Sequence, residues 1–344
     1  MTESPQFNYI ITIHNKEDLI KEVLTCVLIC CRDNSHVYPV LDGCTDRTET
    51  IVDDLIKTFA HIPITKVHTP DVHEIRSINA GLKAANHEGK GYNIILQDDV
   101  LLHDFLLQER IAQLYDWAGE KLGVVSFRHG ANLANDTLSS NSVQPFADYV
   151  ENAYGHGIPD ARVLLPGQLA YRTIAIKSPV CLPFDLIRSL GLLEEKLAPY
   201  MCDDFEYSIR STQAGYHNGV FGIRYQSDVD WGTTRTRPDS RLQVLEKRNI
   251  GLIKDWHQDA IAHIIAGVQT DQVIDVPGMV TRAEQDLAIE TLKRNQKRLE
   301  QFFQPDQPGL VGRVKRKIKT TLQKLMISSS KQESAQQYQG EYKG

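Results

Sequence analysis

Short apolar segments alternate with amphipathic helical patterns along the first part of the chain. Four of them are β-branched and bounded by polar residues, which predicts buried strands at 9–13, 37–41, 62–67 and 92–96. The segments between them carry apolar residues at three- and four-residue spacing, which predicts helices with one buried face. This alternation predicts an α/β fold, in which a Rossmann-like, mostly parallel sheet has helices on both faces.

The second part of the chain is less regular. Between about residues 126 and 166, Asn, Ser, Gly and Pro are frequent, which predicts an irregular insertion over a site. Regular elements return at 174–180, 184–190 and 204–214. From residue 240 onward the pattern predicts only helices, near 240–268, 281–303 and 310–327.

Composition and charge narrow the function classes. The chain has 344 residues, with 38 Lys and Arg against 44 Asp and Glu, and this mildly acidic balance argues against a general nucleic-acid binder. No apolar run approaches the roughly 18–20 residues that span a bilayer. The first residues lack the basic start and apolar stretch of a signal peptide. The six cysteines form no Cys-x-x-Cys pair, so we expect reduced thiols in a cytoplasmic protein.

Polar residues follow three of the predicted strands. In an open parallel sheet, ligands bind beyond the carboxyl ends of the strands. These ends lack the Gly-x-Gly-x-x-Gly of a Rossmann dehydrogenase and the Gly-Lys-Ser/Thr of a P-loop phosphotransferase. A nucleotide would therefore need another phosphate partner, such as a metal. The polar residues at the strand ends are Thr12, His14 and Asn15, then Asp42 to Asp46, then Gln97, Asp98 and Asp99.

Two acidic clusters are candidates for chemistry. Asp98 and Asp99 repel each other, and a bound cation relieves that repulsion. Oxygen-only ligands favour Mg²⁺ or Mn²⁺. The alternative is a solvated Asp-Asp turn that caps the next helix. The second cluster, Asp203 to Glu206, lies in the first turn of a predicted helix, where acids also serve helix stability alone. Arg210 lies four residues after Glu206, as a surface partner would.

Five motifs in this order resemble the family 2 inverting glycosyltransferases of the GT-A fold, over about residues 8–225. Two features depart from the family pattern. Leu96 and Gln97 stand where the first acid of the metal motif is expected, and a further histidine ligand is missing from 228–232. The motifs are Thr12 to Asn15, Asp42-Gly43-Cys44-Thr45-Asp46, Asn79-Ala80-Gly81-Leu82, Gln97-Asp98-Asp99 and Asp203 to Arg210.

The resemblance implies a role for each matching residue. Asp204 would be the general base, and Asp99 would hold the Mn²⁺ or Mg²⁺ that bridges the diphosphate. Asp203 and Glu206 would shape the acceptor site. Trp231 is a further candidate, which either stacks on the acceptor or packs in the core. The residues that would face the nucleotide-sugar are Thr12, Asn15, Asp42, Asn79 and Asp98.

These observations predict a metal-dependent enzyme that moves a sugar from a UDP- or GDP-sugar to an acceptor hydroxyl. The acceptor would be a glycan, a lipid-linked glycan or a protein, in glycan or polysaccharide biosynthesis. One alternative is a nucleotidyltransferase on a similar sheet, although its glycine-rich first loop is absent. Another is a non-catalytic glycan- or nucleotide-binding relative. The predicted parts are a nucleotide-binding half at 1–125, an acceptor half at 126–238, a helical extension at 239–327 and a disordered tail at 328–344.

The predicted last helix, 310–327, is basic and amphipathic. Its apolar stripe runs from Leu310 to Leu325, and six Lys or Arg residues surround the stripe without an acid between them. Two interpretations are open. The helix either contacts an anionic membrane, so that the protein lies at the inner face of the membrane, or packs against its own domain or a partner subunit.

Deletion of the residues after Pro308 discriminates between these interpretations. If the helix binds lipid, the full-length protein sediments with anionic liposomes at low salt and the truncated protein does not, because the basic charge is lost. Hydrolysis of a soluble donor should stay nearly unchanged. A full-length protein that ignores such liposomes at low salt leaves the packing interpretation.

Overall fold

The computed structural model describes residues 4–134, 146–155, 157–158, 161–227, 240–267 and 273–303, and the structural statements below refer to these residues. The chain divides into two compact units, 1–292 and 293–344. The described part of the second unit is the end of one helix. The predicted Trp231 site, the boundary at residue 238, the basic helix 310–327 and the tail 328–344 all lie outside the described residues.

Fifteen strands and eight α-helices are described, together with two short 3₁₀ helices, η1 (Ala153–Gly155) and η2 (Glu195–Leu197). The strands are β1 (Gln6–Ile13), β2 (Ser35–Asp42), β3 (Val67–Thr69), β4 (Gly91–Gln97), β5 (Leu101–Leu102), β6 (Leu122–Ser126), β7 (His129–Leu133), β8 (Phe146–Asn152), β9 (Arg162–Leu164), β10 (Gln168–Tyr171), β11 (Ile174–Ile176), β12 (Val180–Pro183), β13 (His217–Phe221), β14 (Tyr225–Gln226) and β15 (Val273–Asp275). The helices are α1 (Ile20–Cys30), α2 (Thr48–Thr58), α3 (His73–Ala84), α4 (Leu107–Ala118), α5 (Phe184–Leu190), α6 (Asp203–Gln213), α8 (Ser240–Gly267) and α9 (Arg282–Phe303).

A large sheet forms the centre of the first unit. Its strand order, in the described residues, is β15-β10-β13-β6-β12-β4-β1-β2-β3. The four strands predicted to form its nucleotide half, β4, β1, β2 and β3, pair in parallel. β12 then inserts antiparallel between β4 and β6. The predicted α/β architecture is confirmed in this part of the chain.

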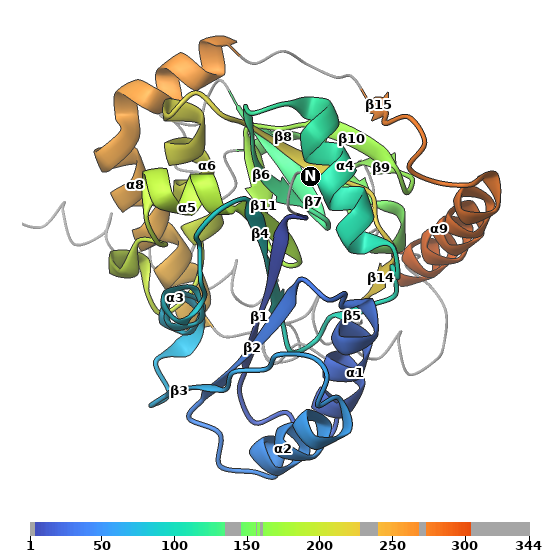
Figure 1. The fold of residues 1–344 in the computed structure, drawn as a ribbon. Coiled ribbons are helices and arrows are strands. Elements are labelled where there is room, and N and C mark those ends of the chain that lie inside the picture. The colour runs from blue at the N-terminus through green and yellow to red at the C-terminus, as the bar shows by residue number, and fades with distance from the viewer. Residues whose placement is uncertain are drawn as a thin grey trace, which may run out of the picture. The chain divides into compact units, whose positions relative to one another are not determined.

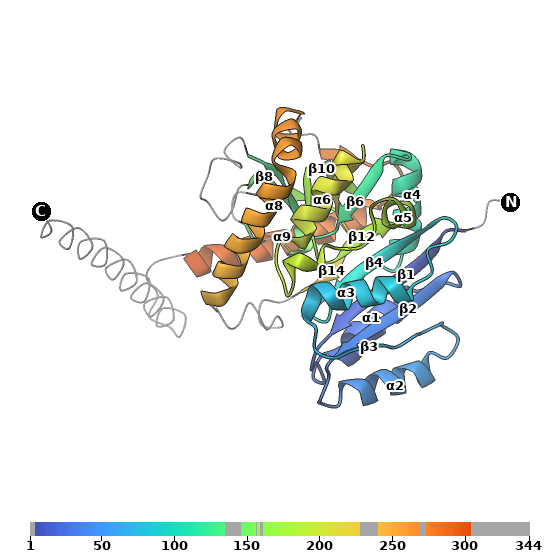
Figure 2. The same ribbon diagram turned by 90° about the vertical axis from the view of Figure 1, so that its left-hand side faces the viewer.

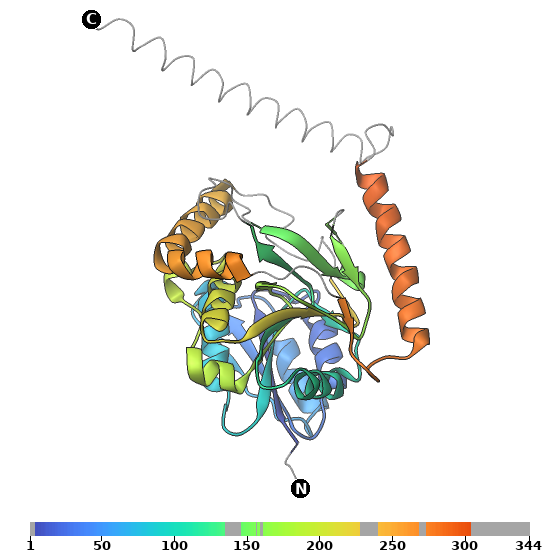
Figure 3. The same cartoon turned by 90° about the horizontal axis from the view of Figure 1, so that it is seen from above.

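Alternating side chains of β1 supply the two halves of the core. Phe7, Tyr9, Ile11 and Ile13 pack on one face with α1, α2 and α4, whereas Ile10 packs on the other. That second face is covered by α3, α5, α6 and α8. Figure 1 shows the two sets of helices on opposite sides of the sheet, and Figure 2 looks onto α3, α5, α6 and α8. In Figure 3, the yellow-green α5 and α6 and the orange α8 gather on one side.

The register of the parallel strands brings their carboxyl ends to one edge. Ile13 of β1 lies opposite Leu41 of β2, and Thr12 lies opposite Gln97 of β4. The loops that follow these strands, which carry the predicted nucleotide-site residues, therefore begin at the same level of the sheet.

Three predictions of local structure are wrong. The chain after residue 240, expected to form only helices, contributes β15, which pairs with β10 at the edge of the large sheet. The region expected to be an irregular insertion contributes β7, β8 and β9, which form a second sheet with β11 in the order β11-β7-β8-β9. Each of these strands is short, and in β7 and β8 polar residues lie on both faces. The usual alternation of apolar and polar residues is therefore not visible, and the sequence pattern resembles that of a loop. The strand predicted at 62–67 is also misplaced, because β3 is Val67–Thr69 and residue 64 makes only an isolated bridge with Val37.

The helical segment after residue 239 belongs partly to the same core. Ile250, Ile253 and Ile261 of α8 are buried together with Phe205 and Ile209 of α6. No helix among the described residues is both long enough and apolar enough to span a bilayer.

Gly81 lets α3 lie close to the sheet. An added Cβ at this position would lie 2.5 Å from Cγ2 of Ile10 and 2.9 Å from Cγ2 of Val40, which are closer than real Cβ contacts. Both neighbours are β-branched residues of buried strands and have little rotamer freedom. The glycine of the Asn79-Ala80-Gly81-Leu82 motif therefore has a packing function.

Gly81→Ala should lower the free energy of unfolding by about 1–3 kcal/mol, because overpacking outweighs the gain in helix propensity. Gly251→Ala in α8 is the matched control, since an added Cβ there meets nothing within 4 Å. The control should be neutral or stabilising by up to about 1 kcal/mol. Urea denaturation of both variants measures the difference. Equal stabilisation by the two changes would contradict the packing argument.

Candidate active site

Loop-to-loop hydrogen bonds join the ends of β1, β2 and β4. The backbone N–H of His14 donates to Oδ2 of Asp98 at 3.0 Å, which ties the β1 loop to the β4 loop. The backbone N–H of Thr45 donates to Oδ1 of Asn15 at 2.8 Å, which ties the β2 loop to the β1 loop. Thr12 is nearly buried beside them. The structure thus brings together Thr12, Asn15 and Asp98, three of the residues predicted to face a nucleotide-sugar.

Asp42 is directed at the first turn of α3. Its Oδ1 accepts hydrogen bonds from Thr69 Oγ1 and from the backbone N–H of Val72, both at 2.7 Å. Its Oδ2 accepts from the backbone N–H of His73 at 2.9 Å. These amides are otherwise unsatisfied at a helix start, and a carboxylate there also complements the helix dipole. Asp42 therefore positions α3, and its contact with a nucleotide stays a prediction.

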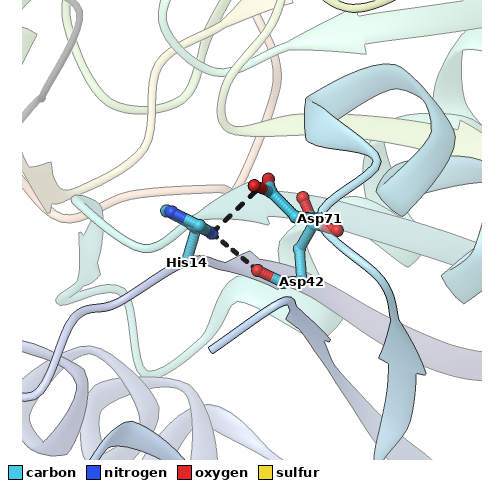
Figure 4. A group of neighbouring side chains, drawn as sticks. All are labelled: His14, Asp42 and Asp71. Atoms are coloured by element: carbon cyan, nitrogen blue, oxygen red, sulfur yellow. Dashed lines mark hydrogen bonds and ion pairs between the residues drawn. The ribbon is translucent and has the colours of Figure 1, made fainter. Parts of the chain in front are cut away.

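His14, Asp42 and Asp71 form the one group of metal-ligand type found among the described residues (Figure 4). The hydrogen bonding does not favour a metal there. Nδ1 of His14 lies 2.6 Å from the backbone carbonyl of Asp42 and carries the proton, so that only Nε2 keeps a lone pair, and Nε2 accepts a hydrogen bond from Nδ2 of Asn15 at 3.2 Å. Both carboxylate oxygens of Asp42 already accept hydrogen bonds from the start of α3.

The acidic pair after β4 is a better fit to a cation. Oδ1 of Asp98 lies 3.3 Å from Nζ of Lys16. Burial raises the pKa of Asp98, and Lys16 opposes that effect. Asp99 is a buried carboxylate of the hard-oxygen type that Mg²⁺ and Mn²⁺ prefer, and a cation at Asp99 stays a prediction.

The helix-capping alternative for this pair is not supported. α4 begins at Leu107, and its leading amide, that of Leu106, donates to Oδ1 of Asp104 at 3.3 Å. The other oxygen of Asp104 pairs with Arg110. The local cap is therefore Asp104 and not the pair at 98 and 99.

The two acids at the start of α6 have different environments. Asp203 is fully buried, and its Oδ2 lies 2.5 Å from Nζ of Lys177. Asp204 is partly exposed, and its Oδ2 accepts a hydrogen bond from the backbone N–H of Lys177 at 3.2 Å. Consecutive helix residues differ in direction by about 100°. Asp204 is therefore the member of the pair that is accessible to solvent, and its contact with substrates stays a prediction.

The environment of Asp204 suits a base that works near neutral pH. Burial raises the pKa of Asp204 to about 7, with the negative charge of Asp203 acting in the same direction. Lys177 and two backbone hydrogen bonds oppose the shift. A catalytic base is most effective when its pKa lies close to the working pH.

Lys177 and Glu74 also contact this group of residues, although no sequence motif predicts them. Nζ of Lys177 lies 3.3 Å from Oε1 of Glu74, and the same oxygen accepts a hydrogen bond from Gln97 Nε2. Ser178 Oγ accepts from the backbone N–H of Gln97 at 3.1 Å. The ends of β4 and the start of α6 are therefore connected through residues 177 and 178. The sequence offers one signal for Lys177, which is a single basic residue between two apolar segments.

Two predicted substrate residues have their side chains engaged by the chain itself. The amide of Asn79 exchanges hydrogen bonds with both backbone groups of Leu193, at 2.9 and 3.0 Å. Glu206 accepts from Nε of Arg210 at 2.8 and 2.9 Å and lies 3.1 Å from Nε2 of His257. Asn79 thus holds α3 to the segment before η2, and Glu206 holds α6 to α8. Contacts of either residue with substrate stay predictions.

Comparison with known proteins agrees with this arrangement. Residues 9–155 match the family model described as Glycosyl transferase family 2. Comparison with curated protein sequences finds no match. The fold is similar to that of TarS 1–349 from S. aureus in complex with UDP, with a TM-score of 0.50 and 16% identity over 86% of this chain and 83% of that chain.

Two further structures are similar. The complex of TarS 1–349 with UDP-GlcNAc has a TM-score of 0.51 and 14% identity, over 76% of this chain and 71% of that chain. The mannosyltransferase PcManGT from Pyrobaculum calidifontis, in complex with GDP-Man and Mn²⁺, has a TM-score of 0.45 and 14% identity over 88% of each chain, which is too distant to carry an argument. At these identities the TarS likeness supports the fold alone.

Proposed function

We propose that this chain is a family 2 glycosyltransferase of the GT-A fold, which transfers a sugar from a nucleotide-diphospho-sugar to an acceptor hydroxyl with inversion at the anomeric carbon. One observation carries the proposal. The strand ends that hold Asp98 and Asp99 are joined through Lys177 and Ser178 to the start of α6, where Asp204 lies. Two acidic groups of different environment thus belong to one site.

Asp204 acts as the base in this proposal. An acceptor hydroxyl must lose its proton as it attacks, and a carboxylate with a pKa of about 7 can take that proton at neutral pH. The N–H groups of Lys177 and Phe205 orient the two oxygens of Asp204. A single displacement of this kind inverts the configuration, because the acceptor attacks the face opposite the departing diphosphate.

Asp99 holds the divalent cation in this proposal, Mn²⁺ or Mg²⁺. When bound, the cation would supply Lewis-acid neutralisation of the leaving diphosphate. Asp98, fixed by Lys16 and by the backbone of His14, would hold the ribose or the sugar beside it. Thr12 and Asn15 lie at the same edge and would contact the base and ribose.

We propose the donor and the acceptor as chemical classes and not as single compounds. The TarS structures of similar fold are complexes with UDP and UDP-GlcNAc, so a UDP-sugar is the first donor to test, with a GDP-sugar next. A glycan, a lipid-linked glycan or a protein would be the acceptor. We also retain the proposal that residues 310–327 contact an anionic membrane, which would place the enzyme at the cytoplasmic face and its product in polysaccharide or related biosynthesis.

Asp204→Asn tests the assignment of the base. The change keeps the volume and removes the proton acceptor, so turnover of the UDP- or GDP-sugar that the wild type uses should fall by about a hundredfold or more. Affinity for UDP should stay close to that of the wild type. Asp185→Asn, an exposed acid of α5, is the control and should leave turnover unchanged. If Asp204→Asn transfers normally and Asp203→Asn does not, the two roles must be exchanged.

Asp99→Asn tests the assignment of the cation. Calorimetric titration of UDP and GDP with and without Mn²⁺ should show that the variant loses most of the metal-dependent part of the affinity, while circular dichroism shows an intact fold. Asp71→Asn is the matched control, because Asp71 belongs to the competing group with His14 and Asp42. Loss of metal-dependent affinity in Asp71→Asn but not in Asp99→Asn would move the cation to that group.

A further inference from the structure

A single buried lysine connects two helices that the sequence places far apart. Lys177 lies between β11 and β12, and only 12% of its side chain is exposed. Its ammonium group lies 2.5 Å from Oδ2 of Asp203 in α6 and 3.3 Å from Oε1 of Glu74 in α3. Its backbone N–H holds Asp204. Lys177 therefore contacts one acid of the nucleotide half and both acids at the start of α6.

The apolar surroundings of Lys177 strengthen the electrostatic interactions of its ammonium group. A pocket beside Lys177, Asp203 and Asp204 is otherwise lined by apolar side chains and Tyr207, so water screens these charges poorly. The carboxyl groups of Glu74 and Asp203 contact the ammonium group of Lys177, and the charge of Asp204 acts on it without a direct contact. Burial lowers the pKa of Lys177, but the charges of Asp203, Glu74 and Asp204 outweigh burial and raise it, so the side chain stays charged. Loss of one partner from such a cluster leaves buried charges uncompensated.

Few other charged groups act on Asp204. On α6, Glu206 is turned toward Arg210 and toward His257 of α8. Burial raises the pKa of Glu206, but these two partners outweigh burial and lower it. The thiol of Cys202 directly precedes the acidic pair. Glu246 of α8 lies near this thiol, because the charges of Glu246 and Asp204 both raise the pKa of Cys202. Among the residues that the structure describes, Lys177 is the basic residue that contacts both members of the acidic pair, Asp203 through its ammonium group and Asp204 through its backbone N–H.

We propose that Lys177 is a positioning residue for sugar transfer: by bridging Glu74 and Asp203 and holding Asp204 through its backbone N–H, it orients Asp204 and stabilises its negative charge. The proposal rests on the role of Asp204 as the base. The same contacts join the nucleotide half to the acceptor helix, because Gln97, the last residue of β4, contacts the same oxygen of Glu74 as Lys177 does.

The sign of the pH effect follows from the charges. Transfer requires the ionised form of Asp204, so the rate rises with pH through the pKa of about 7. Lys177 lowers this pKa, and removing its charge should move the rising limb of the pH–rate profile to higher pH. Asp203 raises the pKa, and removing its charge should move the limb to lower pH. Opposite charges within contact distance shift a pKa by about 1–3 units.

The experiment compares Lys177→Met, Lys177→Arg and Asp203→Asn with the wild type. The pH dependence of kcat/KM with the accepted UDP- or GDP-sugar is measured for each, together with UDP affinity and thermal unfolding. We expect the limb to move up by about one pH unit or more in Lys177→Met, to move down in Asp203→Asn, and to stay near the wild type in Lys177→Arg. Lys57→Met, an exposed lysine of α2, is the control and should shift nothing.

The outcomes separate this proposal from the proposed function. If Asp204→Asn keeps its turnover, Asp204 is not the base and the proposed function fails. If Asp204→Asn is inactive and a folded Lys177→Met loses activity equally at every pH, only the positioning role of Lys177 is overturned. If Lys177→Met does not fold, Asp203→Asn decides, because an unmoved limb in that variant overturns the proposal and a downward shift supports it.

Discussion

The parallel register of β1, β2 and β4 is the constraint on which the site depends. Parallel strands point their carboxyl ends the same way, so residues separated by about 30 and 85 positions reach one edge. The loops at that edge are then held by each other, as when the backbone of His14 donates to Asp98. A one-residue slip of β1 would reverse the faces of Ile10 and Ile11 and separate the loops, so core packing and site geometry specify the same register.

A buried ionic cluster adds the acceptor side to this edge. Charges in a poorly hydrated place are costly alone, and the cluster of Lys177, Asp203 and Glu74 offsets that cost by close pairing. The same pairing leaves Asp204 partly exposed with a pKa near neutrality. The stability of the fold and the ionisation of the proposed base therefore depend on the same few contacts.

Several motif residues have a structural function in the described chain. Asp42 caps α3, Asn79 fixes the segment before η2, and Gly81 permits close packing of α3 on β1. Glu206 is buried and joins α6 to α8 through His257. Motif spacing alone does not separate these residues from those that face a ligand, because both kinds are polar or small and both lie at strand ends or in first helical turns. Hydrogen-bond partners from distant segments make the distinction.

Periodicity by itself determined the α/β architecture, most helices and the edge at which polar residues gather, because apolar spacing and strand ends are local properties of the chain. It missed the sheet formed by β11, β7, β8 and β9, whose short strands carry no clear period. Only the tertiary structure decided that Asp204, and not Asp203, is accessible to solvent. It also decided that Lys177 joins Glu74 of the nucleotide half to Asp203 of the acceptor half. These relations arise where β12 inserts antiparallel beside β4, as when Val180 pairs with Ile95 and Pro183 with Tyr92, and no local pattern encodes a contact at such a separation in sequence.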